Sequence, residues 1–326
     1  MHPPASASTK WSASPTSAEP VATATLLLPA RARLPGALPA DAVAHALTRA
    51  DRAQGAAGER AQLQRHFTLD AEPWPVAALT RQLDAGDAAG ASWVRADPAF
   101  VVPDMHGARM MAYGEALALE ADDLAALLPD LRPLFADAGF VLDAPDPSRW
   151  YVRLSPEAQL PEFAEPESAL GDDLFAHLPP GEAGRRWRAL LTESQVLLHQ
   201  HPWNRQRAAR GKAPVNSLWF WGGGRLDSTV VSPHAQVRSR DALLRALAKA
   251  AGVSADVGAK VDALVDLRHL RSLQQFGEDA VQPLLLAMAR GELDRLILDF
   301  QDGEILTLAH AQRWRFWRRP AATLEG

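Results

Sequence analysis

The segment from His201 to Gly224, HPWNRQRAARGKAPVNSLWFWGGG, constrains the fold more than any other part of the chain. Pro202 cannot donate a hydrogen bond inside a helix, so the preceding helix should end near His201. A basic loop should follow around Gly211, and Asn216–Trp221 should form a buried strand. The three glycines at 222–224 then allow a tight turn or the close approach of a ligand.

The basic loop and the glycine run together suggest a site for a small anion, because exposed backbone amides and arginines both attract negative charge. A simpler interpretation fits the same residues. Trp219 and Trp221 lie two positions apart, so they share one face of the strand and can belong to the core. Since the glycine run has no fixed phosphate-binding spacing, the pattern leaves both interpretations open.

Composition limits the class of protein. The 326 residues can bury a large core and form two domains, and the 47% hydrophobic and 22% charged content is ordinary for a globular protein. The net charge of −5 argues against nucleic acid as a partner, and no apolar run of about 18 residues predicts a membrane span. The absence of cysteine excludes disulfides and thiolate zinc sites and fits a cytoplasmic location.

The pattern of elements favours an α/β sheet, because the strand Val21–Leu28 precedes a helix at Asp41–Gln54. Asp302-Gly303 predicts a hairpin between Leu293–Phe300 and Ile305–Ala309. Further helices are predicted at Val76–Asp84, Glu120–Asp137, Arg185–His201, Asp241–Ala251, Ala255–Gln274 and Glu278–Arg290. Further strands are predicted at Ala99–Val102, Arg109–Tyr113, Trp150–Leu154 and Thr229–Ser232.

The segment from His201 to Gly224 resembles part of the archaeal-type, cofactor-independent phosphoglycerate mutase family. The matching residues are His201-Pro202-Trp203-Asn204, Gly211-Lys212-Ala213-Pro214 and Asn216-Ser217-Leu218-Trp219-Phe220-Trp221-Gly222-Gly223-Gly224. The chain departs from the family at Trp203, where a small aliphatic residue is usual, and at Gly223, where Gln or Ala is common. From about Ala22 to Arg319 the chain is also similar to the bacterial RpfE-type regulatory proteins.

The resemblance implies an α/β fold with an alkaline-phosphatase-like core sheet flanked by helices and a smaller inserted α+β domain. Residues 1–20, rich in Ser, Ala and Pro, are predicted to be a disordered tail. The discontinuous core is predicted at 21–98 plus 215–326, and the inserted domain at 99–214.

The family is a two-metal phosphomutase with a serine nucleophile, and this chain departs from it at three places. Pro29-Ala30-Arg31 stands where the family has a metal-binding Asp followed by Gly after the first strand. Residues 58–66 match the region of the family's serine nucleophile, but they contain no Ser or Thr. Beyond Gly224, none of the histidines (His234, His269 and His310) follows an Asp. We therefore predict no catalytic residue, no metal site and no cofactor.

The substrate-binding side is partly retained, so we predict a set of anion-binding candidates. Arg149 matches a family arginine, and Arg153 should share its strand face, so the two could clamp a phosphate or pair with acids in Glu157–Glu167. The full set of candidates is Arg149, Arg153, His201, Asn204, Lys212, Asn216, Trp221, Gly222, Gly223 and Gly224.

Three hypotheses follow. The favoured one is a non-catalytic bacterial relative of phosphoglycerate mutase with a regulatory or small-anion-sensing role. It would bind a phosphorylated or carboxylated metabolite, and its protein partner stays unknown. The second is an active phosphoryl-transfer enzyme in which His201, His66 and Asp51 or Asp84 converge. The third is an interaction module built on the tryptophan face and the basic tail Arg313–Arg319.

Overall fold

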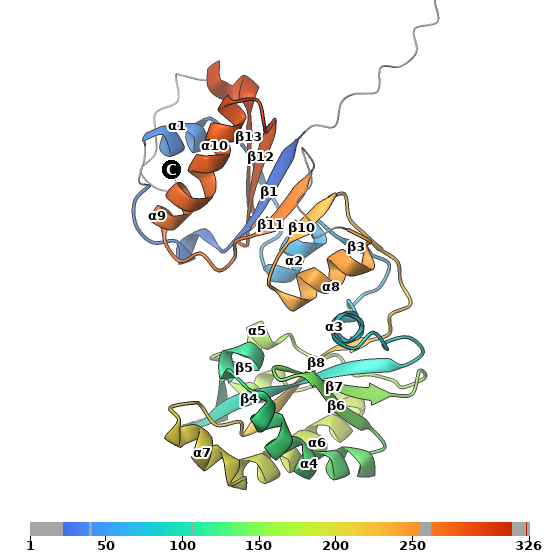
Figure 1. Ribbon diagram of the computed structural model, residues 1–326. Coiled ribbons are helices and arrows are strands. Elements are labelled where there is room, and N and C mark those ends of the chain that lie inside the picture. The colour runs from blue at the N-terminus through green and yellow to red at the C-terminus, as the bar shows by residue number, and fades with distance from the viewer. Residues whose placement is uncertain (1–21, 39–40, 106, 254–261, 315–323, 325–326) are drawn as a thin grey trace, which may run out of the picture.

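Two β-sheets separated by a layer of helices organise the chain (Figure 1). The computed structural model describes residues 22–38, 41–105, 107–253, 262–314 and 324, so the predicted tail at 1–20 lies outside the described residues. No helix in these ranges is both long and apolar enough to cross a lipid bilayer. The mixed architecture, with sheets flanked by helices, confirms the predicted α/β class.

The larger sheet combines four parallel strands with an antiparallel edge. In spatial order its six strands are β10 (Gln236–Arg238), β11 (Ala263–Asp266), β1 (Thr23–Leu28), β12 (Arg295–Phe300), β13 (Glu304–Ala309) and β2 (Asp51–Gln54). The first four run parallel, and β13 and β2 are antiparallel to their neighbours. Leu26 and Leu28 pack on one face of β1 and Leu27 on the other, as a strand covered on both faces requires.

Helices cover both faces of this sheet. One face packs against α1 (Asp41–Arg49), α9 (Leu273–Gln275), the π-helical turn Phe276–Val281 and α10 (Gln282–Ala289). The other packs against α2 (Glu59–Gln64), α3 (Val76–Asp84) and α8 (Ala242–Ala250). α3 contacts both α8 and the second sheet, so this helical layer joins the two sheets (Figure 1).

The second sheet is built around β4. β8 pairs along one edge of β4, while β7 and β5 pair one after the other along the opposite edge. Its strands are β4 (Ser92–Asp104), β5 (Gly107–Tyr113), β6 (Val141–Asp146), β7 (Arg149–Leu154) and β8 (Ser217–Gly224), and β3 (Thr68–Leu69) pairs separately with β9 (Val230–Val231). Helices α4 (Ala121–Asp137), α6 (Gly181–Gln200) and α7 (Trp203–Ala209) lie on the face away from the large sheet, and the short α5 is Pro166–Ala169 (Figure 1).

The tryptophan strand alternates between two cores. Trp219 and Trp221 pack in the core between the two sheets, which confirms that they share one face. Leu218 and Phe220 point to the opposite face, toward α4 and α6. There the Phe220 ring lies edge-on to Trp187, with centroids 5.1 Å apart. Both faces of β8 are therefore buried.

Several predicted elements are wrong in type or extent. The expected basic loop contains the helix α7, which begins directly after Pro202. Proline is tolerated at the start of a helix, because the first N–H groups of a helix have no partner within it. The helix expected at Asp41–Gln54 ends at Arg49, after which β2 pairs with β13. In the described part of Ala255–Gln274, residues 263–266 form β11, a strand between two parallel neighbours, so burial on both sides overrides the helical pattern.

The second sheet also extends beyond the predicted domain limits. β4 begins before residue 99, and β8 lies after residue 214 but pairs with β4. The division of the chain into a core and an insert stays a prediction.

A line of polar side chains connects α2 to the end of β12. The carboxylate of Asp299 accepts hydrogen bonds from the guanidinium of Arg65 at 2.6 and 2.9 Å, and it lies 2.8 Å from Nε2 of His66. Nδ1 of His66 lies 2.9 Å from Nε2 of His234, whose Nδ1 is 3.0 Å from Asp262. Burial alone would raise the pKa of Asp299, but Arg65 and His66 hold it below its usual value of 3.8.

We expect Asp299→Asn to lower the free energy of unfolding at neutral pH by about 3 kcal/mol, because it leaves Arg65 and His66 facing an uncharged amide. A carboxyl group with a lowered pKa stabilises the fold above its unfolded value and loses that contribution as the pH falls. The decline of wild-type stability below pH 3.8 should therefore be shallower in the variant. Urea unfolding across pH 7 to 3 measures both effects, and equal stability at pH 7 would contradict the assignment.

Candidate functional site

The carboxyl ends of the four parallel strands border a cleft of about 780 Å³. Ligands of open α/β sheets commonly bind at this edge, where the strand ends and the loops that follow them meet. β1 leads into the turn Arg31–Arg33, β10 ends at Arg238, β11 is followed by Arg268, and β12 by Gln301. We take this cleft as the candidate functional site.

Arginines are the most frequent residues in the lining of the cleft. Its positive side chains are Arg33, Arg238, Arg240, Arg268 and Arg271, with His269 beside them, and its carboxylates are Glu59, Glu115, Asp241 and Asp266. The arginines come from loops after three different strands, β1, β10 and β11, so the fold brings together charges that are far apart in the sequence.

Arg268 contacts three of the four carboxylates. Its Nε and Nη2 donate to the two oxygens of Asp266 at 2.8 and 3.0 Å, and its Nη1 donates to Glu59 at 2.5 Å. The Nη2 also lies 3.5 Å from Asp241. The fourth carboxylate, Glu115, lies 3.3 Å from Nη1 of Arg149. Every carboxylate of the cleft therefore already contacts a guanidinium.

The other four arginines form no ion pair within the described part of the chain. Arg238 donates only to the side chain of Gln236, and Arg271 only to the backbone carbonyls of residues 268 and 270. The side chains of Arg33 and Arg240 are exposed and have no polar partner among the described residues. The cleft thus holds four positive charges without a matching carboxylate.

The pKa values of two carboxyl groups in the cleft, Asp266 and Glu59, shift in opposite directions. Burial alone would raise the pKa of Asp266, but its hydrogen bond and attraction to Arg268, together with Ser239, hold that pKa below 3.8. Burial raises the pKa of Glu59 above 4.5, and the nearby charges of Glu167 and Asp241 add to this effect although Arg268 opposes it. Both carboxyl groups contact Arg268, which outweighs burial at Asp266 but not at Glu59.

The side chains that could bind a metal ion or act as a nucleophile can be checked one by one in the described part of the cleft. Among the described residues, no three His, Asp or Glu side chains are arranged to hold a metal ion. The hydroxyl in the cleft belongs to Ser239, which donates to Asp266 at 2.7 Å and accepts from the backbone N–H of Asp241 at 2.9 Å. Because the pKa of Asp266 is lowered, it is a poor base for activating this hydroxyl. The arrangement suits anion binding better than group transfer.

A second pocket of about 270 Å³ adjoins the cleft and shares Glu115 and Asp241 with it. Here Arg95 and Asp97 form a buried bidentate pair, with both N–O distances 2.9 Å. Nε1 of Trp221 donates to the same Asp97 at 2.7 Å. Trp221, a predicted ligand residue, is thus engaged with a protein carboxylate.

Arg149 also lines this second pocket, but three carboxylates surround it. Its guanidinium donates to Asp84 at 2.8 and 3.0 Å, to Asp146 at 2.7 Å and to Glu115 at 3.3 Å. Arg153 lies in a different pocket, beside Arg81. The structure therefore does not bring Arg149 and Arg153 to one ligand, and Arg149 pairs with none of the acids between 157 and 167.

The remaining polar candidates bond to the protein itself. Nε2 of His201 lies 3.3 Å from Asp130, and its Nδ1 accepts from the backbone of residue 203. Nζ of Lys212 lies 2.7 Å from Glu120. The side chain of Asn216 bonds the N–H and C=O of residue 101 at 2.8 and 2.7 Å. None of these three lines the cleft or the second pocket.

Asn204 joins three backbone groups. Its Nδ2 donates to the carbonyls of Leu198 and Val215 at 2.7 and 2.9 Å, and its Oδ1 accepts from the N–H of Val215 at 2.9 Å. The side chain is buried. Asn204 therefore ties the end of α6 to the segment that leads into β8, and it lies outside the cleft.

The glycine run approaches protein atoms closely. A Cβ at Gly222 would lie 2.9 Å from the side chain of Val76, at the start of α3, and one at Gly224 would lie 2.8 Å from Pro75. A Cβ at Gly223 would lie 2.8 Å from Leu160. The small size of these residues is explained by packing of β8 against α3 and the loop before α5.

The convergence of His201, His66 and Asp51 or Asp84 does not occur. His66 contacts Asp299, Asp84 binds Arg149, and Asp51 accepts from Gln312 at 2.8 Å. The prediction that these residues form a relocated metal site, which would have supported an active enzyme, is therefore wrong.

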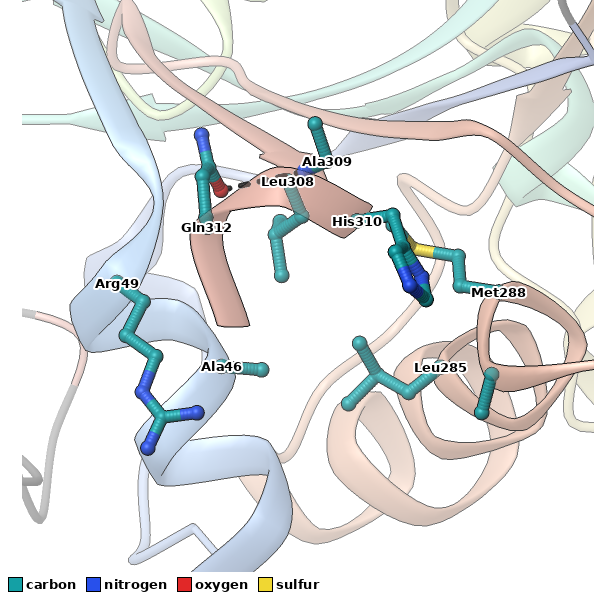
Figure 2. Close-up of a pocket in the computed structure, with 9 residues that line it drawn as sticks. Ala46, Arg49, Leu285, Met288, Leu308, Ala309, His310 and Gln312 are labelled. Carbon is teal, nitrogen blue, oxygen red and sulfur yellow. Dashed lines mark hydrogen bonds between the residues drawn. The ribbon is translucent and has the colours of Figure 1, made fainter. Parts of the chain in front are cut away.

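An apolar pocket of about 320 Å³ lies between α1, α10 and the end of β13 (Figure 2). Leu285, Met288 and Leu308 form its floor and walls, and Arg49 extends along its rim. Gln312 accepts from the N–H of residue 309 at 3.2 Å, as the dashed line in Figure 2 shows. This pocket lacks a group of charges and none of the predicted residues lies in it, so it is the weaker candidate.

Comparison with known proteins supports a relationship to phosphoglycerate mutases over a short segment. The chain is 42% identical over 60 residues to a probable 2,3-bisphosphoglycerate-independent phosphoglycerate mutase of Geobacter sulfurreducens, and 38% identical over 63 residues to one of Methanosarcina mazei. These segments are 18% and 19% of this chain, and 15% and 16% of the relatives. The chain thus matches less than a fifth of the length of these relatives. No family model matches it.

Two solved structures align with most of the chain at low similarity. The cofactor-independent phosphoglycerate mutase of Thermoplasma acidophilum gives a TM-score of 0.39 at 15% identity, over 89% of this chain and 90% of that one. The PH0037 protein of Pyrococcus horikoshii gives 0.44 at 11% identity, over 89% and 88%. Because both scores are low, the fold assignment rests on the strands and helices themselves. The resemblance to RpfE-type proteins stays a prediction.

We expect Asn204→Ala to lower the free energy of unfolding by about 2–3 kcal/mol, because it leaves the buried N–H and C=O of Val215 without partners, whereas the carbonyl of Leu198 keeps the N–H of His201. Lys212→Ala is the matched control from the same motif. It removes an exposed ion pair and should cost at most about 1 kcal/mol. Urea unfolding compares the two, and similar losses would argue against a structural role for Asn204.

We expect Gly222→Ala to cost more stability than Gly211→Ala. Both residues have a positive φ, +63° and +70°, which costs an alanine about 1 kcal/mol. A Cβ at 211 meets no atom within 4 Å, whereas at 222 it meets Val76, and such overpacking adds about 1–3 kcal/mol. Thermal and urea unfolding of both variants give the difference, and equal losses would show that β8 can move away from α3.

Proposed function

We propose that this protein is a non-catalytic relative of phosphoglycerate mutase that binds a small phosphorylated or carboxylated metabolite and acts in regulation. The observation that carries the proposal is the cleft at the carboxyl edge of the parallel sheet. There the chain places four arginines without carboxylate partners, and each carboxylate of the cleft contacts a guanidinium.

Electrostatics separates this function from metal-dependent phosphoryl transfer. A divalent cation needs oxygen or imidazole ligands that are free to coordinate it. In the cleft, the carboxylates of Asp266 and Glu59 point to Arg268, so a cation would compete with that guanidinium. The unpaired guanidiniums of Arg33 and Arg240 would repel the cation and attract an anion.

The regulatory role follows from binding without turnover. A protein that holds a metabolite and leaves it unchanged can report its concentration through a change in stability or partner affinity. The predicted resemblance to RpfE-type proteins agrees with this role, and we propose a bacterial, cytoplasmic protein. Its protein partner remains to be identified, and the net charge of −5 argues against nucleic acid.

The proposal predicts no mutase or phosphatase turnover with Mn²⁺, Mg²⁺ or Zn²⁺, measured on the full chain with the Methanosarcina mazei mutase as positive control. It also predicts that 3-phosphoglycerate or a related anion raises the melting temperature. A hundredfold excess over Kd contributes about 2.7 kcal/mol, which corresponds to a shift of several degrees. Turnover that requires an added metal would overturn the proposal and favour an active phosphoryl-transfer enzyme.

A further inference from the structure

The four unpaired arginines of the cleft come from the ends of three strands. Arg238 is the last residue of β10, and Arg240 lies two residues further along the chain. Arg33 follows β1, and Arg271 follows β11. Because these strands are neighbours in the order β10, β11, β1, the four side chains border one cleft from separate loops.

Four like charges in one cleft repel each other, and a bound anion offsets this repulsion. A phosphomonoester carries a charge of about −1.5 to −2 at neutral pH, so one phosphoryl group matches about two guanidiniums. Two phosphoryl groups match all four. Arg268 cannot take part fully, because its Nε, Nη1 and Nη2 already contact Asp266, Glu59 and Asp241.

The size of the cleft leads to the same ligand class. Its volume of about 780 Å³ is near the upper end of the range for small-molecule sites, about 300–1,000 Å³. A single phosphate would fill a small part of that space. A small organic molecule with two phosphoryl groups would fill more of it and could contact more of the arginines that line it.

We propose that the cleft binds a small organic ligand with two phosphoryl groups, held by Arg33, Arg238, Arg240 and Arg271. This inference rests on the proposed non-catalytic function and adds the ligand class and the residues that bind it. It moves the binding site away from Lys212 and the glycine run, and it leaves Arg149 paired with its carboxylates.

The test measures binding by isothermal titration calorimetry on the full chain in metal-free buffer. The probes are inorganic phosphate, inorganic pyrophosphate and fructose 1,6-bisphosphate, which differ in the number and separation of phosphoryl groups. We expect at least tenfold tighter binding of one of the two bisphosphorylated probes than of phosphate. Added salt should weaken the binding, since exposed charges are screened.

Arg33→Gln and Arg240→Gln test whether these two residues bind the ligand. Neither side chain has a polar partner among the described residues, so the variants should keep the wild-type melting temperature. Each should weaken the bisphosphorylated probe at least tenfold. Arg205→Gln is the matched control. It replaces an exposed arginine of α7 that lies outside the cleft, and it should bind like the wild type.

The outcomes separate this inference from the proposed function. Equal affinity for phosphate and for the bisphosphorylated probes would overturn the two-group ligand and leave a small-anion sensor intact. Binding that survives Arg33→Gln and Arg240→Gln but is lost in Lys212→Gln would overturn the location. Failure of all three probes to bind overturns the inference, whereas metal-dependent turnover is what would overturn the non-catalytic function.

Discussion

The ion pairs of Arg268 determine how charge is distributed in the cleft, because they involve three of its four carboxylates. One guanidinium contacts Asp266 at the end of β11, Glu59 at the start of α2 and Asp241 at the cap of α8. It therefore fixes two helices to the carboxyl edge of the sheet. It also occupies the oxygens that a metal ion would otherwise need. The other arginines of the cleft are left without a carboxylate partner among the described residues, so the edge carries unpaired positive charge.

The second sheet completes the cleft through a similar arrangement. Glu115 follows β5 and lines both pockets, and Arg149 on β7 holds it in place. Deeper in the same pocket, Asp97 is fully buried and receives hydrogen bonds from Arg95 and Trp221. Burial raises the pKa of Asp97 above 3.8 even though Arg95 opposes this effect. The carboxylates of Asp97 and Glu115 at this junction thus bond to arginines of the protein itself.

The sequence predicted the elements that have strong local signals. The helix Val76–Asp84 and the hairpin at Asp302-Gly303 are confirmed because their apolar period and turn residues agree with their tertiary contacts. The short strands β10 and β11 carry no such signal, since buried parallel strands lack alternation and β10 has only three residues. Without them, Arg238 and Arg271 could not be placed at a strand end. The arginine cleft was therefore missed, although Arg31 had already marked the end of β1 as unsuited to a metal.

The motif that first pointed to a family has a structural explanation in this chain. Asn204 bonds three backbone groups, Asn216 bonds both backbone groups of residue 101, and Gly222 lets β8 approach α3. Residues with such roles are required for this packing whether or not a reaction takes place. A motif of this kind can therefore accompany a scaffold whose reactive groups have been replaced. Its presence reflects how β8 is held between α6 and α3, whereas the unpaired arginines lie at the edge of the other sheet.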